Sequence, residues 1–437
     1  MNYPEAVEFI DSAVNHEKSV SSQYPEGFKL DRMRALAKAM GNPQNAYESV
    51  IIAGSKGKGS TAALLSSILR MDNLRVGLYT SPHLVTLRER IQVNGLMISE
   101  TRFTEAVLRL RKILEDYSWR KNPPTYFEIL TGIAFSYFKE MKIHAAVLEV
   151  GLGGLFDSTN IANAKVVGIT PIHLEHTDKL GKTLSKIAVQ KCGIIKGREI
   201  VVSAPQAAEV ETVIQRTVED KEAKLVRVGK EIRTFEREWA QDFQRFDLKA
   251  AFGNYYDLEI RLLGAHQLDN AALAVGLAKS LENKTRLKVS ASAVRQGILD
   301  AVWPGRMEKI SKDPTVLLDG AQNPASAKKL IAGIKRHFHY EKLILVLGVS
   351  SDKDLDGILS ELLPEVYCLI ATQSANPRAF TAKIISEHAK EFGKNILVED
   401  SSSAALLKAN SLASPKDLIL VTGSLFLVGE IKAGMKN

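Results

Sequence analysis

The stretch VIIAGSKGKGSTAALL, residues 50–65, begins with a short apolar run and passes through glycines interleaved with two lysines. Apolar residues then recur at helical spacing, at Ala62, Leu65, Ile68 and Leu69. This pattern predicts a strand, a loop and a helix in direct succession. In such a loop, backbone N–H groups and a lysine hold phosphate oxygens at the positive end of the helix. The stretch therefore predicts nucleotide binding.

The loop departs from the strict nucleoside-triphosphate pattern G-x-x-x-x-G-K-[ST]. Gly59 follows Lys58, and the hydroxyl groups come one and two positions later, at Ser60 and Thr61. A glycine-rich turn that only links a strand to a helix therefore stays open as an alternative at this point.

The length and composition are those of an enzyme-sized globular protein. A chain of 437 residues predicts two or three domains, and 45% hydrophobic with 25% charged residues argues against disorder. No apolar run approaches the ~20 residues that span a membrane, and the first residues lack a basic start followed by an apolar block. We therefore expect a cytoplasmic protein without a membrane partner. The two cysteines, Cys192 and Cys368, are far apart and predict buried apolar side chains rather than a disulfide or a thiolate metal site.

The net charge is 58 − 50 = +8, which suits either nucleic acid or polyanionic small molecules. The densest basic segment, residues 108–122, also contains acids and predicts an amphipathic helix with a solvated face. We therefore expect no nucleic-acid partner.

Strand and helix patterns alternate along the chain, which predicts an α/β fold with a mostly parallel sheet. Residues 224–263 show short period-2 runs instead and predict a small antiparallel patch, while residues 81–95 predict an ordered polar surface loop that ends in an Asn-Gly turn. Pro304 and Gly305 interrupt the pattern before a second alternation begins. We predict a P-loop ATPase domain over residues 1–301, a Rossmann-like α/β domain over residues 302–437, and an active site in the cleft between them.

Two further segments carry residues suited to binding metal ions. Glu149 ends the apolar run HAAVLEV directly before the turn GLGG, where a carboxylate can ligate Mg²⁺, although an exposed acid at a strand end is the alternative. The segment HLEHTDKLG brings together His173, Glu175, His176 and Asp178, but it fits no zinc signature and could be an ordinary polar loop.

The ensemble of motifs resembles one family of enzymes. In order, the chain carries AGSKGKGST, TSPHLVTLRERIQVNG, LEVGLGGLFDSTN, HLEHTDKLG, QKCGI, GAHQLDNAA, WPGR and DGAQNPAS. These resemble the folylpolyglutamate synthase and dihydrofolate synthase family, which belongs with the Mur-type amino-acid ligases. The resemblance covers nearly the whole chain. It implies ATP-dependent addition of L-glutamate to dihydropteroate, to folates or to both, through an acyl phosphate.

The resemblance implies catalytic and metal-binding roles for particular positions. Lys58 would hold the β- and γ-phosphates, Ser60 and Glu149 a first Mg²⁺, and Glu149 and His176 a second Mg²⁺. Lys191 matches a lysine that is carbamylated in relatives, which turns a cation into an anion.

The resemblance also implies the surroundings of both substrates. The nucleotide side would comprise Gly54, Ser55, Gly57, Lys58, Gly59, Ser60, Thr61, Asn270, Arg306 and Asp319. The pterin side would comprise Ser81, His83, Phe127 and Asp157.

The chain also departs from the family pattern. Leu155 replaces an arginine, Glu175 an aspartate, Gln190 a glutamate, Gln322 a histidine and Ser55 a threonine. The family's arginine at position 155 and its glutamate at position 190 are both lost here, and these two losses could compensate each other in charge. The phosphate, metal and carbamate positions survive, which favours retained ligation.

Two alternatives remain beside the folate ligase. One is a diverged ligase of the same architecture that acts on another carboxylate, suggested by Leu155 and Gln322. The other is a nucleotide-binding regulator without catalytic activity. In each case we expect a monomer.

Overall fold

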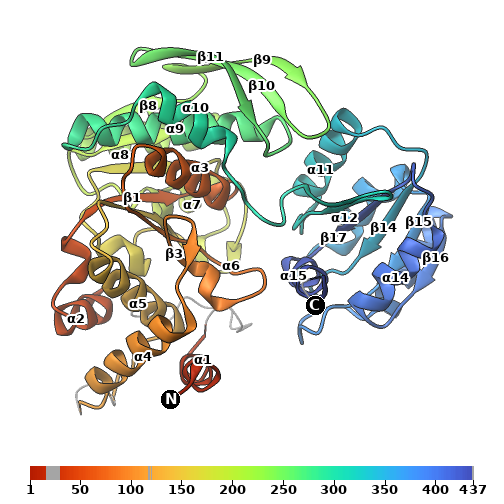
Figure 1. Cartoon of the computed structure of the whole chain (residues 1–437), viewed down its shortest axis with the longest axis horizontal. Coiled ribbons are helices and arrows are strands. Elements are labelled where there is room, and N and C mark those ends of the chain that lie inside the picture. Colours follow the sequence, from red (N-terminus) through yellow and green to blue (C-terminus); the bar gives the residue numbers. More distant parts are fainter. Residues whose placement is uncertain (16–29, 117–118, 120, 436–437) are drawn as a thin grey trace.

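The largest sheet carries eight strands in the order β4-β3-β2-β5-β1-β6-β7-β8 (Figure 1). The computed structural model describes residues 1–15, 30–116, 119 and 121–435. Neighbours from β2 to β8 run parallel, whereas β3 and β4 are antiparallel. The strands are β1 (Glu48–Ala53), β2 (Val76–Tyr79), β3 (Ile91–Val93), β4 (Leu96–Met97), β5 (Ala145–Glu149), β6 (Val166–Ile169), β7 (Ile200–Ser203) and β8 (Lys224–Arg227).

Apolar side chains cover both faces of this sheet, because successive residues of a strand point to opposite sides. In β1, Ile51 and Ala53 join one buried cluster, and Val50 and Ile52 join the other. The first face packs against α1 (Tyr3–Asp11), α2 (Asp31–Ala39), α4 (Glu100–Leu114), α5 (Tyr126–Glu140), α6 (Thr177–Leu180), α7 (Leu184–Cys192) and α8 (Ala208–Asp220). The second packs against α3 (Lys58–Met71), α9 (His266–Lys284) and α10 (Ala291–Leu299).

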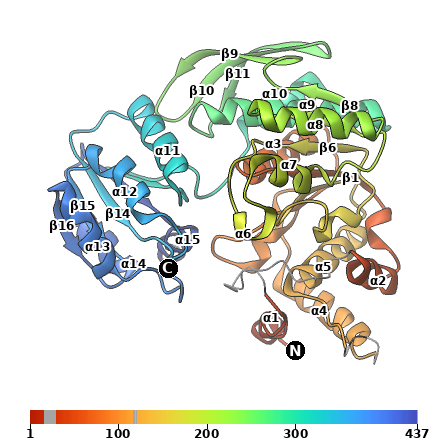
Figure 2. The same cartoon turned by 180° about the vertical axis from the view of Figure 1, so that it is seen from behind.

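A three-stranded antiparallel sheet, in the order β11-β10-β9, lies over α9 and α10 (Figure 2). Its strands are β9 (Ile232–Trp239), β10 (Gln244–Ala250) and β11 (Gly253–Ile260). The predicted antiparallel patch is therefore present, but its first strand was wrongly assigned. Residues 224–227 form β8, which pairs parallel with β7 at the edge of the large sheet.

The third sheet has the order β12-β13-β17-β14-β15-β16, in which only β12 is antiparallel to its neighbour. Its strands are β12 (Glu308–Lys312), β13 (Thr315–Leu318), β14 (Leu343–Leu347), β15 (Cys368–Ala371), β16 (Asn395–Val398) and β17 (Leu418–Thr422). One face packs against α11 (Pro324–His337), α12 (Leu355–Leu362) and α13 (Ala382–Ala389), and the other against α14 (Ser402–Leu412) and α15 (Leu425–Gly434). We call residues 308–435 the C-terminal body and the described residues up to 299 the first body. The α/β class predicted for both is confirmed.

The segment 81–95 differs from the predicted surface loop. It contains a 3₁₀ turn over Leu87–Arg90 and then β3, and the Asn94-Gly95 turn leads into β4. Arg90 and Ile91 are buried. The turn was therefore predicted correctly, but the strands around it were missed.

Two expectations from composition are met within the described residues. Cys192 and Cys368 are both buried and unpaired. Among the helices described, none is long and apolar enough to cross a membrane.

Candidate active site

The cleft between the two bodies lies at the carboxyl edge of the large sheet. Gly54 follows β1, Glu149 ends β5 beside Ile52 of β1, and Thr170 follows β6. Loops after parallel strands meet at one edge, which is the usual ligand site of α/β sheets. The cleft has a volume of about 1940 Å³, and residues of both bodies line it.

The glycine-rich loop is shaped by close backbone approaches. Gly54 has φ +141°, and a Cβ there would overlap Thr170. Gly57 has φ +88°, and a Cβ there would lie 2.5 Å from the side-chain oxygen of Asn270. The first intrahelical bond of α3 runs from the N–H of Thr61 to the carbonyl of Gly57 at 2.9 Å. The preceding N–H groups of the first turn therefore have no acceptor within the helix and can serve an anion.

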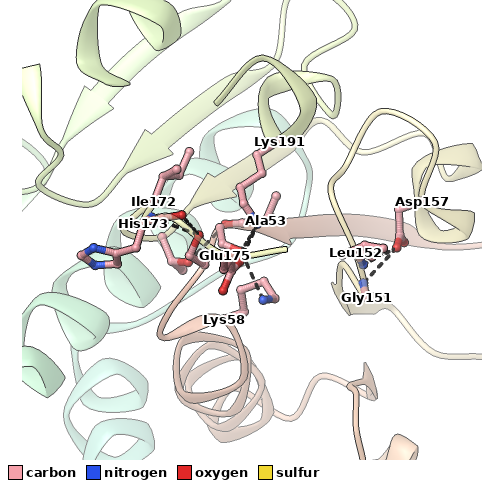
Figure 3. Close-up of polar contacts among 12 residues, drawn as sticks. Ala53, Lys58, Gly151, Leu152, Asp157, Ile172, His173, Glu175 and Lys191 are labelled. Carbon is pink, nitrogen blue, oxygen red and sulfur yellow. Dashed lines mark hydrogen bonds and ion pairs between the residues drawn. The ribbon is translucent and has the colours of Figure 1, made fainter. Parts of the chain in front are cut away.

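Two lysines share one backbone oxygen of this loop. The Nζ of Lys58 donates to the Gly54 carbonyl at 3.1 Å, and the Nζ of Lys191 donates to the same oxygen at 2.7 Å. Lys191 also donates to Glu175 Oε1 at 3.0 Å. Figure 3 shows Lys58 and Lys191 reaching the loop from opposite sides, with Glu175 beside them. The predicted Lys58 and Lys191 are thus brought together from α3 and α7.

Charges around this cluster shift its pKa values. Burial lowers the pKa of Lys191 to about 8, and the nearby Lys58 adds to the lowering. Burial alone would raise the pKa of Glu175, but Lys58 and Lys191 outweigh it and hold that pKa at about 2. Glu175 is therefore an anion and Lys191 a weakened cation near neutral pH.

Glu149 is a buried carboxylate that points into the cleft. Its Oε2 accepts the N–H of Ser81 at 3.1 Å. Burial raises the pKa of Glu149, while Lys58, the Ser81 N–H and Arg306 lower it. A buried carboxylate that receives few hydrogen bonds is suited to a cation, because a bound cation restores the charge balance that burial disturbs.

Ser55 of the glycine-rich loop is hydrogen-bonded to the segment that contains His176. The Oγ of Ser55 donates to the His173 carbonyl at 3.1 Å, and the His173 N–H donates back to Ser55 Oγ at 3.0 Å. His176 has φ +47° and begins the short α6. Burial lowers its pKa, so it is neutral and able to ligate a metal near pH 7. Across the described parts of the chain, no three His, Cys, Asp or Glu side chains stand ready to hold a metal, so Ser60, Glu149 and His176 stay predicted ligands.

The C-terminal body contributes Asp319 and Gln322 to the cleft lining, and the linker before it contributes Arg306. Asp319 accepts the N–H of Met307 at 2.9 Å and that of Ala321 at 2.8 Å. Asp319 therefore organises the backbone just after Arg306 and just after β13. A direct contact of Asp319 with the nucleotide stays a prediction.

The predicted pterin-side residues Ser81, His83, Phe127 and Asp157 also line the cleft. Phe127, in the first turn of α5, packs against Gly151, where a Cβ would lie 2.6 Å from its ring. Asp157 Oδ2 accepts the N–H groups of Gly151 at 2.9 Å and Leu152 at 3.0 Å, as Figure 3 shows. Asp157 therefore shapes the GLGG turn. Its contact with substrate is not tested by this geometry.

Two departures from the family pattern are neighbours. The N–H of Leu155 donates to the carbonyl of Gln190 at 2.8 Å. The compensated-pair hypothesis requires that these two positions touch, and they do. That the two charge losses compensate each other stays a prediction. A third departure, Glu175, is the residue paired with Lys191.

Several cleft residues escaped the sequence analysis. Lys56, inside the quoted loop, is largely buried, and burial lowers its pKa. Arg90 is 2% exposed, and its Nε donates to His83 Nδ1 at 3.0 Å. Lys56 and Arg90 both lie inside motifs quoted from the sequence, and their positive charge beside the phosphate loop or the polar segment could have marked them as cleft residues. Lys353 and Arg378, which line the cleft from the C-terminal body, carried no such signal.

Family models and known proteins were compared with the chain. The Mur ligase middle domain matches residues 52–278, and the glutamate ligase domain of Mur ligases matches residues 305–425. The dihydrofolate synthase/folylpolyglutamate synthase of Bacillus subtilis (strain 168) is 33% identical over 409 residues, which cover 93% of this chain and 95% of that protein.

Two solved structures resemble the whole chain. Mycobacterium tuberculosis folylpolyglutamate synthase complexed with ADP has a TM-score of 0.91 at 30% identity and covers 100% of this chain and 98% of its own. E. coli FolC in complex with DHPP and ADP has a TM-score of 0.88 at 29% identity, with coverage of 100% and 98%.

Proposed function

This chain belongs to the folylpolyglutamate synthase and dihydrofolate synthase family of Mur-type ligases, and we propose that it uses ATP to add L-glutamate to dihydropteroate, to folates or to both. One observation carries the proposal. The glycine-rich loop, Glu149 and the Lys191–Glu175 pair meet at one edge of the sheet, in a cleft shared with a glutamate ligase domain. Relatives of similar sequence carry this activity in their names, and solved relatives hold ADP.

The chemistry explains the concentration of cations. A carboxylate is a poor electrophile, so ATP first converts it to an acyl phosphate, and two anions must approach each other for this step. The N–H groups of the loop and Lys58 stabilise the charge that develops during phosphoryl transfer. The amine of glutamate then attacks the acyl carbon, and phosphate leaves. Closure of the two bodies over the cleft would limit hydrolysis of the intermediate by water.

Magnesium would bind at the carboxyl edge of the sheet. Ser60 and Glu149 would hold one Mg²⁺, and Glu149 with His176 a second, because a buried carboxylate, a hydroxyl and a neutral imidazole are suitable donors. Bound there, the ions would offset phosphate charge. Ser81 keeps Glu149 oriented through its backbone N–H.

Lys191 would carry a carbamate in the active enzyme. Its amine is buried, and its pKa of about 8 leaves part of it neutral near pH 7. A neutral amine attacks CO₂, forms an N–C bond and releases one proton. The product is an anion that can support the second metal site.

Nucleotide contacts of Asn270, Arg306 and Asp319 and pterin contacts of Ser81, His83, Phe127 and Asp157 belong to the same proposal, supported by their positions along the cleft. We also propose the domain division at residues 301/302, in the connection between α10 and β12. The monomeric state and the cytoplasmic location stay predictions.

Phosphate release tests the proposal. The purified protein is incubated with ATP, Mg²⁺ and L-glutamate, with dihydropteroate, a reduced folate or neither. We expect release that depends on a pterin acid and on glutamate. Turnover with some other acid alone would favour the diverged ligase, which the Leu155 and Gln322 departures suggest. Nucleotide binding without turnover on any acid would favour the regulator.

A further inference from the structure

The segment between β2 and β3 reaches from the first body to the C-terminal body. In both views this orange segment extends toward α15 (Figures 1 and 2). Leu84 of this segment packs against a buried apolar cluster of the C-terminal body. Val428 of α15 and Val316 and Leu318 of β13 belong to that cluster. A leucine of the first body thus joins the core of the other body.

Two glycines form the seat for Leu84. A Cβ at Gly429 would overlap the carbonyl oxygen of Leu84, so the helix approaches the segment backbone to backbone. A Cβ at Gly305, which has φ +72°, would lie 3.5 Å from a methyl group of Leu84 and 3.4 Å from Val428. The absence of a side chain at Gly429 is therefore what admits Leu84, while Gly305 lies in ordinary van der Waals reach of it.

One carboxylate holds the segment in a fixed conformation. Glu89 accepts the N–H groups of Leu84 at 2.7 Å, Val85 at 3.0 Å and Thr86 at 2.9 Å. Charge-assisted hydrogen bonds of this kind are among the stronger ones in proteins. Leu84 is consequently attached to a rigid turn rather than to a free loop.

The other end of the segment touches the proposed catalytic centre. The N–H of Ser81, three residues before Leu84, donates to Glu149 Oε2. A short and well-bonded stretch of backbone therefore joins α15 to Glu149. Displacement of α15 would therefore act on the backbone stretch that donates to the carboxylate.

We propose that Leu84 is a positioning residue of the ligation reaction, whose seat on Gly305, Val428 and Gly429 sets the C-terminal body relative to Glu149. This inference rests on the proposed function. The phosphate loop and Glu149 lie on the first body, whereas the matched glutamate ligase domain forms most of the C-terminal body, so their alignment depends on contacts between the bodies. Small misplacements of reacting groups cost large factors in rate.

The experiment compares Leu84→Ala with Leu84→Met and with Leu96→Ala. Leu96 is a 75% exposed leucine of the same sheet and serves as the matched control. For Leu84→Ala we expect kcat to fall at least about tenfold. The dissociation constant of ADP should rise by a smaller factor than kcat falls, because the phosphate loop lies within the first body and only the proposed contacts of Arg306 and Asp319 lie outside it. Leu84→Met should restore at least half of the activity, and Leu96→Ala should match the wild type.

Gly429→Ala tests the seat from the opposite side. We expect a similar loss of kcat, and the double variant Leu84→Ala/Gly429→Ala should lose no more than the worse single variant, because both break one contact. X-ray scattering of the ligand-free variants should show a larger radius of gyration than the wild type. Wild-type kcat in Leu84→Ala, or additive losses in the double variant, would overturn the inference.

The two proposals can fail separately. A wild-type protein that ligates no acid would remove the proposed function, while scattering would still report whether Leu84 and Gly429 hold the bodies together. An active wild type with an unaltered Leu84→Ala variant would remove the positioning role alone.

Discussion

Lys58 is held by its own loop, through the Gly54 carbonyl. A phosphate group would offer this lysine a charged acceptor in place of a neutral one. The sequence predicted Lys58 at the phosphates, because lysine between glycines is a recognisable pattern. Its sharing of an oxygen with Lys191 could not be predicted, since 133 residues separate them (191 − 58 = 133) and only the fold unites them.

Substitution of Lys58 by alanine should lower kcat/KM at least a hundredfold. Preorganised charge at the transferring phosphoryl group contributes factors of this size. Steady-state phosphate release measures the effect. Lys186→Ala, which removes an exposed lysine of α7, is the control and should leave activity intact. A variant within threefold of wild type would contradict the role of Lys58.

The carbamate on Lys191 should depend on pH. Its pKa lies at about 8, below the ordinary 10.5, so the neutral amine increases as pH rises from 7 to 9. Only the neutral amine reacts with CO₂, so the modified fraction should increase over the same interval at constant dissolved CO₂. Native mass spectrometry should show one added CO₂. Lys191→Gln should show none, and an unmodified wild type at pH 9 with CO₂ present would contradict the assignment.

Elements were predictable where their pattern was long and local. The α/β alternation, α5 and the C-terminal strands followed from apolar periodicity. β3 and β4 were missed because they have three and two residues and depend on pairing, β3 with β2 and β4 with β3. β8 was placed in the wrong sheet because a strand pattern does not specify its neighbour. The α6 turn at His176 requires a positive φ that histidine rarely adopts, so no propensity predicts it.

The turn between β1 and α3 should tolerate no side chain at its first glycine. Gly54→Ala places a Cβ against Thr170 at φ +141°, so we expect a loss of at least about 2 kcal/mol of unfolding free energy. Urea unfolding measures the loss. Gly434→Ala, where a Cβ would meet nothing within 4 Å, should be neutral or slightly stabilising. Equal stability of the two variants would show that the loop relaxes around Gly54.

At the scale of the whole molecule, His337 of α11 bonds the two bodies together. Its Nδ1 donates to the Ala240 carbonyl at 2.7 Å, and the N–H of Gly264 donates to its Nε2 at 3.3 Å. Arg336 pairs with Glu236 of β9 nearby. The sequence predicted two α/β parts and a cleft. It could not predict this junction, because the contacts join residues about 70 to 100 positions apart.

Removal of His337 should weaken the junction. His337→Ala leaves a buried N–H and a carbonyl without their partner, which should cost about 1–3 kcal/mol of unfolding free energy at pH 7.5. His339→Ala, an exposed neighbour, is the control. Loss of stability equal to that of the control would contradict the role of the junction.

The same contact should weaken in acid. Burial lowers the pKa of His337 below its ordinary 6.5, so the folded protein holds the ring neutral. The unfolded chain binds a proton more readily as pH falls below 6.5, and folding loses stability there. The stability difference between wild type and His337→Ala should therefore shrink between pH 7.5 and pH 5.5. Urea unfolding at both values measures it, and a constant difference would be evidence against this linkage.

The Leu84 seat has a mechanical consequence. The linker at residues 300–307, the His337 junction and the Leu84 seat support the C-terminal body at three separate places. Three separate supports hold one rigid body in a single orientation on another. With only two supports, rotation about the line that joins them remains possible. Release of Leu84 alone would therefore allow the C-terminal body to rotate about the linker and the His337 junction.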